Sequence, residues 1–229
     1  MKILSDIPFE LNIEILKEKL HIKSGSCYEQ CMEDIISTAY KVANPKVVFK
    51  ESSVGSRKND SVIIGSVEFI SKTLRKNLEK VERVFPYVAT CGVELDNVKI
   101  NRDDLLEQYI LETVKEILLQ ESMGYLERYI CKRYGVKTAS MNPGSSDLFA
   151  WAIEQQKELF SLFPDISKAI GVKLTENYFM IPNKSISGIR FPADTGFHNC
   201  RVCDRKRCPS RVKPFNEALL KSTLESMNI

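Results

Sequence analysis

The chain has 229 residues, of which 43% are hydrophobic and 28% charged, values typical of an ordinary globular protein with a sizeable core. It has no run of about 18 apolar residues and no apolar secretion signal at its start. We therefore expect a cytoplasmic protein without a membrane span. The net charge of +3 is too small to indicate a polyanionic partner.

The first third of the chain mixes helical and strand patterns. Apolar residues at steps of three and four predict helices, over residues 11–20, 28–42 and 67–81. Short apolar runs predict strands, over residues 3–9, 46–51 and 83–91. Residues 52–60 are polar and predict a loop, and residues 61–66 fit either a short strand or a connection.

Residues 101–134 form the longest predicted helix, with an apolar stripe that is typical of core packing. A kink or break would fall at Gly124, and Gly135 ends the helix. The chain has no Gly-x-Gly-x-x-Gly fingerprint and no regular strand–helix alternation. These patterns favour an α+β fold with a mainly antiparallel sheet.

Pro143 and Gly144 predict a turn that leads into a helix over residues 148–162. Ser145, Ser146 or Asp147 would cap that helix. Free amide hydrogens at such a helix start suit a carboxylate or phosphate, although most turns of this kind are only turns. A short helical piece then ends at Gly171, and strands are predicted over residues 172–178 and 185–191.

Five short features within this stretch carry a resemblance to a known family. They are Pro143 with Gly144, the helix that ends in Glu158, Leu159 and Phe160, the run from Gly171 to Glu176, Met180 with Pro182, and the run from Ser185 to Gly188. In order and spacing they resemble the C-terminal reactivation domain of cobalamin-dependent methionine synthase, which binds S-adenosylmethionine. The resemblance implies a single curved α+β domain over residues 1–196, with helices flanking the sheet, followed by a basic, cysteine-rich tail over residues 197–229.

The resemblance also implies a function in methionine biosynthesis. The chain would be an accessory component that presents S-adenosylmethionine for reductive remethylation of cobalamin, a corrinoid, on a separate methionine synthase chain. If it is an enzyme, it would be a methyltransferase component. The residues implied to bind S-adenosylmethionine are Pro143, Gly144, Ser145, Ser146, Thr175, Glu176, Ser187 and Gly188.

The chain departs from the family pattern at two positions. The family places an arginine three residues before the Pro–Gly pair, where this chain has Ser140, and a tyrosine after the glycine, where it has Ser145. Loss of a bidentate carboxylate anchor would weaken binding by about 2–3 kcal/mol. Because the chain has only His21 and His198, we expect no catalytic nucleophile with a histidine base.

The C-terminal cysteines predict a metal site. Cys200, Cys203 and Cys208 lie within nine positions, and His198 is a candidate fourth ligand. The set fits zinc, a [4Fe–4S] cluster, or reactive thiols without metal. Two other functions therefore stay open: an Fe–S electron donor to a corrinoid protein with a degenerate S-adenosylmethionine pocket, and a zinc-stapled nucleic-acid binder, which little else in the chain supports.

Overall fold

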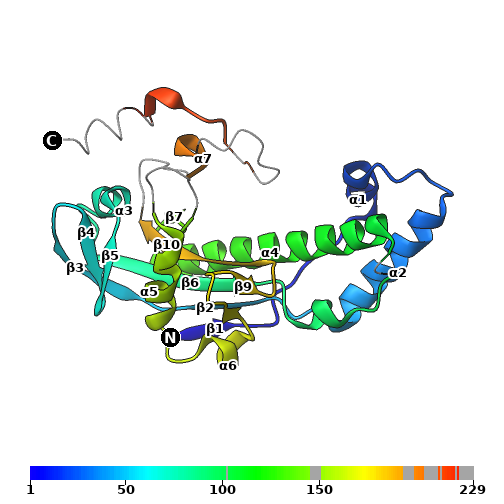
Figure 1. Ribbon diagram of the computed structural model, residues 1–229, viewed down its shortest axis with the longest axis horizontal. Helices are drawn as coiled ribbons and strands as arrows, with labels where there is room; N and C mark the ends of the chain where they lie inside the picture. Colours follow the sequence, from blue (N-terminus) through cyan, green and yellow to red (C-terminus); the bar gives the residue numbers. More distant parts are fainter. Residues whose placement is uncertain are drawn as a thin grey trace.

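The computed structural model describes residues 1–101, 103–144, 151–192, 199–203, 211, 213–219 and 221. Within this part of the chain, eight strands form one sheet (Figure 1). They are β1 Lys2–Leu4, β2 Lys46–Phe49, β3 Ser52–Arg57, β4 Ser61–Ile64, β5 Val67–Ile70, β6 Arg83–Thr90, β7 Thr138–Met141 and β10 Ser185–Pro192. A separate hairpin consists of β8 Lys173–Leu174 and β9 Met180–Ile181.

Helices pack on both faces and at the ends of this sheet. They are α1 Ile13–Leu20, α2 Cys27–Val42, α3 Lys72–Asn77, α4 Leu105–Tyr134, α5 Gln156–Ser161, α6 Ile166–Ile170 and α7 Asn199–Val202, with 3-10 turns η1 Glu94–Asn97 and η2 Ile153–Gln155. In Figure 1 the long α4 runs along the sheet, α1 and α2 lie at one end of the molecule, and the β3–β5 strands with α3 lie at the other.

Strand β6 is the centre of the sheet. It pairs antiparallel with β2 and β3 along one edge and with β10 along the other. Seven of its eight residues are buried, as expected for a strand covered on both faces. Every strand pair in the sheet is antiparallel, and helices flank it, so the predicted α+β class with a mainly antiparallel sheet is confirmed.

Side chains alternate between the two faces of the sheet, and each face has its own core. Phe85, Tyr87 and Ala89 of β6 pack in one cluster with Leu126 and Ile130 of α4. We call this side the α4 face. Val84 and Val88 of β6 belong to the cluster that includes residues of α5 and α6, and we call that side the α5 face. The face on which a residue lies therefore decides which partners it can reach.

Two predictions for the first half of the chain are wrong. Residues 52–60, predicted as a loop, contain β3, in which only Ser52 and Val54 are buried. Residues 67–81, predicted as one helix, form β5 and then α3. The helix starts at Ser71, whose side chain caps it by accepting a hydrogen bond from the Leu74 amide at 3.0 Å.

The long helix α4 agrees with its prediction and continues through Gly124 without a break. The Asp104 side chain caps it by accepting hydrogen bonds from the Leu106 and Glu107 amides. Gly135 ends it in the left-handed conformation. No helix among the described residues is long and apolar enough to span a membrane. The division of the chain at residue 196 stays a prediction.

Candidate functional site

The structure brings two segments of the predicted site together where β7 pairs with β10. Pro143 and Gly144 directly follow β7, and Ser187 and Gly188 lie within β10. Asn142 joins the two segments, because its Nδ2 donates a hydrogen bond to the Ser187 carbonyl oxygen at 2.7 Å. The end of β7 is therefore fixed to the middle of β10.

The helix predicted over residues 148–162 is wrong in its first described part. Trp151 and Ala152 are not helical, and the described helical residues begin at Ile153. The Gly144 amide donates a hydrogen bond to the Trp151 carbonyl oxygen at 2.8 Å, so it is used within the chain and is not free to bind an anion. Gly144 has φ +71°, and a Cβ there would lie 2.6 Å from Ile153 Cδ1. The turn and this close packing explain why position 144 is a glycine.

Four predicted site residues lie outside the described residues. These are Ser145, Ser146, His198 and Cys208.

Thr175 and Glu176 lie in the β8–β9 turn, so the strand predicted over residues 172–178 is wrong beyond Leu174. The Thr175 amide donates to the Phe179 carbonyl oxygen at 2.8 Å, and the Phe179 amide donates to Thr175 Oγ1 at 3.0 Å. These two hydrogen bonds close the turn, which explains why a threonine occupies this position. Glu176 is exposed at the tip of the hairpin.

Ser187 and Gly188 face opposite sides of the sheet. The buried Ser187 hydroxyl donates to Gln156 Oε1 of α5 at 3.1 Å, and Gln156 Nε2 donates to the Tyr178 carbonyl oxygen at 3.0 Å. Ser187 therefore ties the β8–β9 turn to the α5 face. Gly188 lies opposite Tyr87 of β6 and so belongs to the α4 face.

Gly188 leaves room for a polar cluster on the α4 face. A Cβ at this position would lie 2.5 Å from Asn142 Nδ2, 2.6 Å from the Met141 carbonyl oxygen and 2.9 Å from the Tyr87 hydroxyl. Asn142 Nδ2 also donates to the Tyr87 hydroxyl oxygen at 2.7 Å. Burial is the main effect that raises the pKa of Tyr87, against the opposing charge of Arg190, so the phenol is neutral at physiological pH.

Arg190 is the residue of this cluster that the sequence analysis missed. It lies directly opposite Ser140 in the β7–β10 register, so both side chains share the α4 face. The arginine is only 6% exposed. Its Nη1 donates to Thr138 Oγ1 at 3.0 Å and lies 3.6 Å from Glu127 Oε2 of α4, a carboxylate that is 55% exposed.

The Nε atom of Arg190 is buried and has no hydrogen-bond partner among the described residues. A buried donor left without a partner costs about 1–3 kcal/mol, so such an atom calls for an explanation. Nε and a terminal nitrogen together form the planar fork that binds carboxylates and phosphates. A signal was present in the sequence, since an arginine between the apolar residues Ile189 and Phe191 of a predicted strand is unusual.

The cysteines of the described chain do not form a metal site, because no group of three potential ligands lies together there. Arg211 binds the backbone around two of the predicted ligands, donating to the Cys200 and Cys203 carbonyl oxygens at 2.7 and 3.2 Å. Burial raises the pKa of Cys91 to about 12, so its sulfur remains a thiol. The predicted site at Cys200, Cys203, Cys208 and His198 stays a prediction.

The comparisons with known proteins give one informative result. No family model and no curated protein matches this chain. Among solved structures it is similar to the "MetH Reactivation Domain bound to AdoHcy", at 15% sequence identity and a TM-score of 0.56, over 86% of this chain and 80% of that one. The chain therefore has the fold of the MetH reactivation domain, and the resemblance inferred from its short motifs is confirmed at the level of the fold.

Proposed function

We propose that this chain binds S-adenosylmethionine on the α4 face of β7 and β10 and presents it to a corrinoid on a separate methionine synthase chain. The fold likeness to a domain solved with AdoHcy supports the class of ligand. The corrinoid partner follows from the sequence resemblance. S-adenosylmethionine, when bound, would supply the methyl cation that re-forms the methylated corrinoid, with the electron coming from a separate donor and S-adenosylhomocysteine as the leaving product.

The unpaired Nε of Arg190 is the observation that carries this proposal. S-adenosylmethionine has an amino-acid carboxylate, and a carboxylate is the anion that a guanidinium edge binds with two parallel hydrogen bonds. Binding would satisfy a buried donor that has no partner in the described part of the chain. The hydrogen bond from Nη1 to Thr138 holds the guanidinium in place before the ligand arrives.

Arg190 would also take the place of the arginine that the family pattern has where this chain has Ser140. In the family pattern the arginine stands at the position of Ser140, and here an arginine stands on the neighbouring strand directly opposite. The directly opposed Cβ atoms of an antiparallel pair are about 5 Å apart and point to the same face. A guanidinium on β10 can therefore serve the same anion that one on β7 would serve.

The other residues of the cluster shape the site around this anchor. Gly188 leaves the space in which Asn142 bridges Tyr87 and the Ser187 carbonyl. The neutral Tyr87 adds no charge that would compete with the ligand for Arg190. Glu176, exposed on the hairpin, and the undescribed Ser145 and Ser146 stay candidates for further contacts.

Replacement of Arg190 by methionine tests the anchor. We expect Arg190→Met to lose about 10- to 100-fold in affinity for S-adenosylmethionine, the loss of a charged hydrogen-bond pair. Affinity for 5′-methylthioadenosine, which lacks the carboxylate, should stay the same. Titration calorimetry with both ligands measures the two affinities. An unchanged affinity for 5′-methylthioadenosine shows that the site is still folded.

Two further variants make the test specific. Adding Ser140→Arg to the Arg190→Met chain should restore binding, because it returns the guanidinium to the opposite strand. Arg133→Met removes an exposed arginine of α4 and should change neither affinity. The proposal fails if the parent chain binds neither ligand, or if Arg190→Met binds S-adenosylmethionine as the parent does.

A further inference from the structure

Two cysteines near the C-terminal end of the described chain lie on one helical turn. Cys200 is the second residue of α7, and Cys203 directly follows its last residue, Val202. Both side chains are partly exposed, and neither is in a disulfide. Residues three apart on a helical turn have Cα atoms about 5 Å apart, within the range of about 4.4–6.8 Å that a disulfide needs. Because Cys203 lies outside the helix, its backbone is not held in helical geometry, which lets the two Cβ atoms approach.

Residues further along the chain hold this pair in place. Arg211 donates from Nη1 to the Cys200 carbonyl oxygen at 2.7 Å and from Nη2 to the Cys203 carbonyl oxygen at 3.2 Å. One planar guanidinium therefore fixes the backbones of the two cysteines relative to each other. The Asn216 amide also donates to the Arg201 carbonyl oxygen, between the two cysteines, at 2.8 Å. The turn that carries the pair is therefore braced by two later segments.

The other closely spaced cysteines, Cys27 and Cys31, lack this arrangement. Both lie within α2, four positions apart. Because both backbones are helical, their Cβ atoms are about 5–6 Å apart, beyond the roughly 3.5–4.5 Å of a disulfide. Burial and the nearby Glu107 carboxylate also raise the pKa of Cys31, which disfavours its reactive thiolate. This pair therefore serves as a control for the pair on α7.

The sequence around Cys200 and Cys203 is strongly basic. Between positions 201 and 211 the only acidic residue is Asp204, and the five cationic residues are Arg201, Arg205, Lys206, Arg207 and Arg211. An excess of positive charge raises the local concentration of anions and speeds their encounter with the site. Among small disulfides, this segment therefore favours those that carry carboxylates.

We propose that Cys200 and Cys203 form a redox-active pair that reacts with anionic small disulfides. One cysteine thiolate attacks a sulfur of the small disulfide, whose S–S bond breaks and releases one small thiol. The other cysteine attacks the protein sulfur of this mixed disulfide, forms the Cys200–Cys203 bond and releases the second small thiol. Both cysteine protons end on the released thiols, so the protein loses two electrons and the small disulfide gains them.

This assignment takes up the metal-free alternative for the C-terminal cysteines and does not rest on S-adenosylmethionine binding. Oxidised glutathione, an anionic disulfide, tests it on the full chain, after the zinc and iron content of the purified protein has been measured. Trypsin cleaves after Arg201 and Arg207 and so places Cys200, Cys203 and Cys208 in separate peptides. Mass spectrometry then identifies each disulfide by the two peptides that it links.

We expect a Cys200–Cys203 disulfide, two reduced glutathione molecules released per chain, and no Cys27–Cys31 disulfide. Cys208→Ser should react in the same way, whereas Cys200→Ser and Cys203→Ser should stop at a glutathione mixed disulfide. The proposal is overturned if no Cys200–Cys203 disulfide forms in the parent or in Cys208→Ser. It is also overturned if the chain retains zinc or iron and does not react.

Two further measurements test the positioning by Arg211 and the preference for anions. Arg211→Met should lower the equilibrium constant for oxidation by glutathione about threefold or more, because the two thiols are held together less well. Lys213→Met removes an exposed cation nearby and should not change it. Added salt should slow the reaction with oxidised glutathione and speed that with cystamine, a cationic disulfide. An unchanged constant in Arg211→Met, or the same salt response for both disulfides, would contradict the proposal.

Discussion

Gly188 has no side chain because other atoms occupy the space where a Cβ would lie. The nearest of them include the Met141 carbonyl oxygen, a backbone atom at 2.6 Å that cannot move away without distorting β7. The sequence resemblance selected Gly188 as a binding residue, and the structure adds a packing reason for the glycine. In either role, Gly188 lies beside Asn142 and Tyr87.

Gly188→Ala should destabilise the protein. The added methyl group forces β7 away from β10 and costs about 1–3 kcal/mol, the usual range for overpacking. The midpoint and slope of urea unfolding measure the change in the free energy of unfolding. A Gly188→Ala chain as stable as the parent would contradict the packing account.

At the residue scale, the sequence picked out four residues that the structure brings together and missed the arginine beside them. Pro143, Gly144, Ser187 and Gly188 stand in short motifs that carry the backbone turns and close contacts of this fold, and their role in binding stays a prediction. Arg190 was missed because its importance depends on the β7–β10 register, which brings positions 50 residues apart into direct opposition. No local pattern in the sequence encodes that pairing.

At the scale of single elements, predictions succeeded where the pattern was long and failed where two short elements adjoin. The 30-residue helix α4 and the buried strand β6 were both predicted. The apolar stripe over residues 67–81 was real in its spacing but spans a strand and a helix, and Ile70 within it is 60% exposed. The two-residue turn at Gly65 and Ser66, which joins β4 to β5, was the signal that could have separated them.

Gly124→Ala tests a glycine for which the structure shows no backbone need. It lies inside α4, and a Cβ there meets only the flexible end of Arg128, with Nη1 at 3.2 Å. Replacing an interior helical glycine by alanine should stabilise the protein by about 0.5–1 kcal/mol. Thermal unfolding should show a higher midpoint than the parent. A lower midpoint would mean that α4 needs the glycine for a contact outside the described residues.

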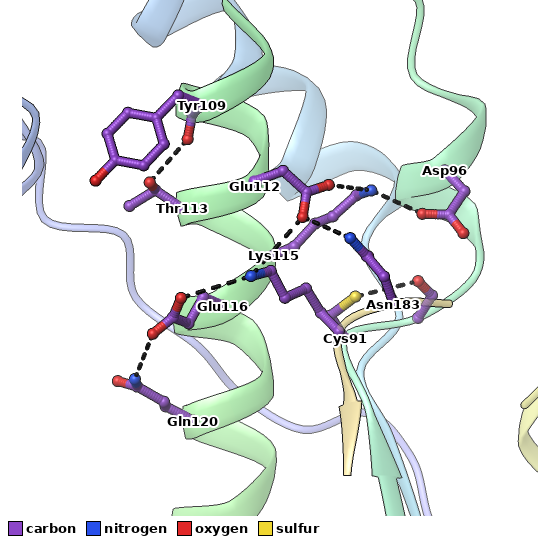
Figure 2. Close-up of polar contacts among 11 residues, drawn as sticks. Cys91, Asp96, Tyr109, Glu112, Thr113, Lys115, Glu116, Gln120 and Asn183 are labelled. Atoms are coloured by element: carbon purple, nitrogen blue, oxygen red, sulfur yellow. Dashed lines mark hydrogen bonds and ion pairs between the residues drawn. The ribbon is translucent and has the colours of Figure 1, made fainter. Parts of the chain in front are cut away.

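At the scale of the whole molecule, a polar cluster around Lys115 of α4 connects three parts of the chain that are distant in sequence (Figure 2). Asp96 follows β6, Glu112 and Lys115 belong to α4, and Asn183 precedes β10. The pKa of Glu112 is lowered in the folded protein, so its interactions contribute stability above its ordinary pKa of 4.5 and lose it as the pH falls through the folded value.

Glu112→Gln should therefore be less stable than the parent at pH 7, by about 1 kcal/mol for a partly exposed ion pair. The difference should shrink as the pH is lowered toward 3, because the parent carboxylate becomes protonated. Urea unfolding across this pH range measures it, with the exposed Glu10→Gln as the control. A difference that persists unchanged at pH 3 would show that charge is not its source.

The position of β6 in the sheet has a consequence for how the protein is made. Its second neighbour, β10, follows it by roughly a hundred residues, and long-range pairings of this kind form slowly. On the ribosome, β6 emerges early and waits with one row of backbone donors and acceptors uncovered. Until Ser185–Pro192 is synthesised, this edge of β6 in the nascent chain is open to pairing with other strands.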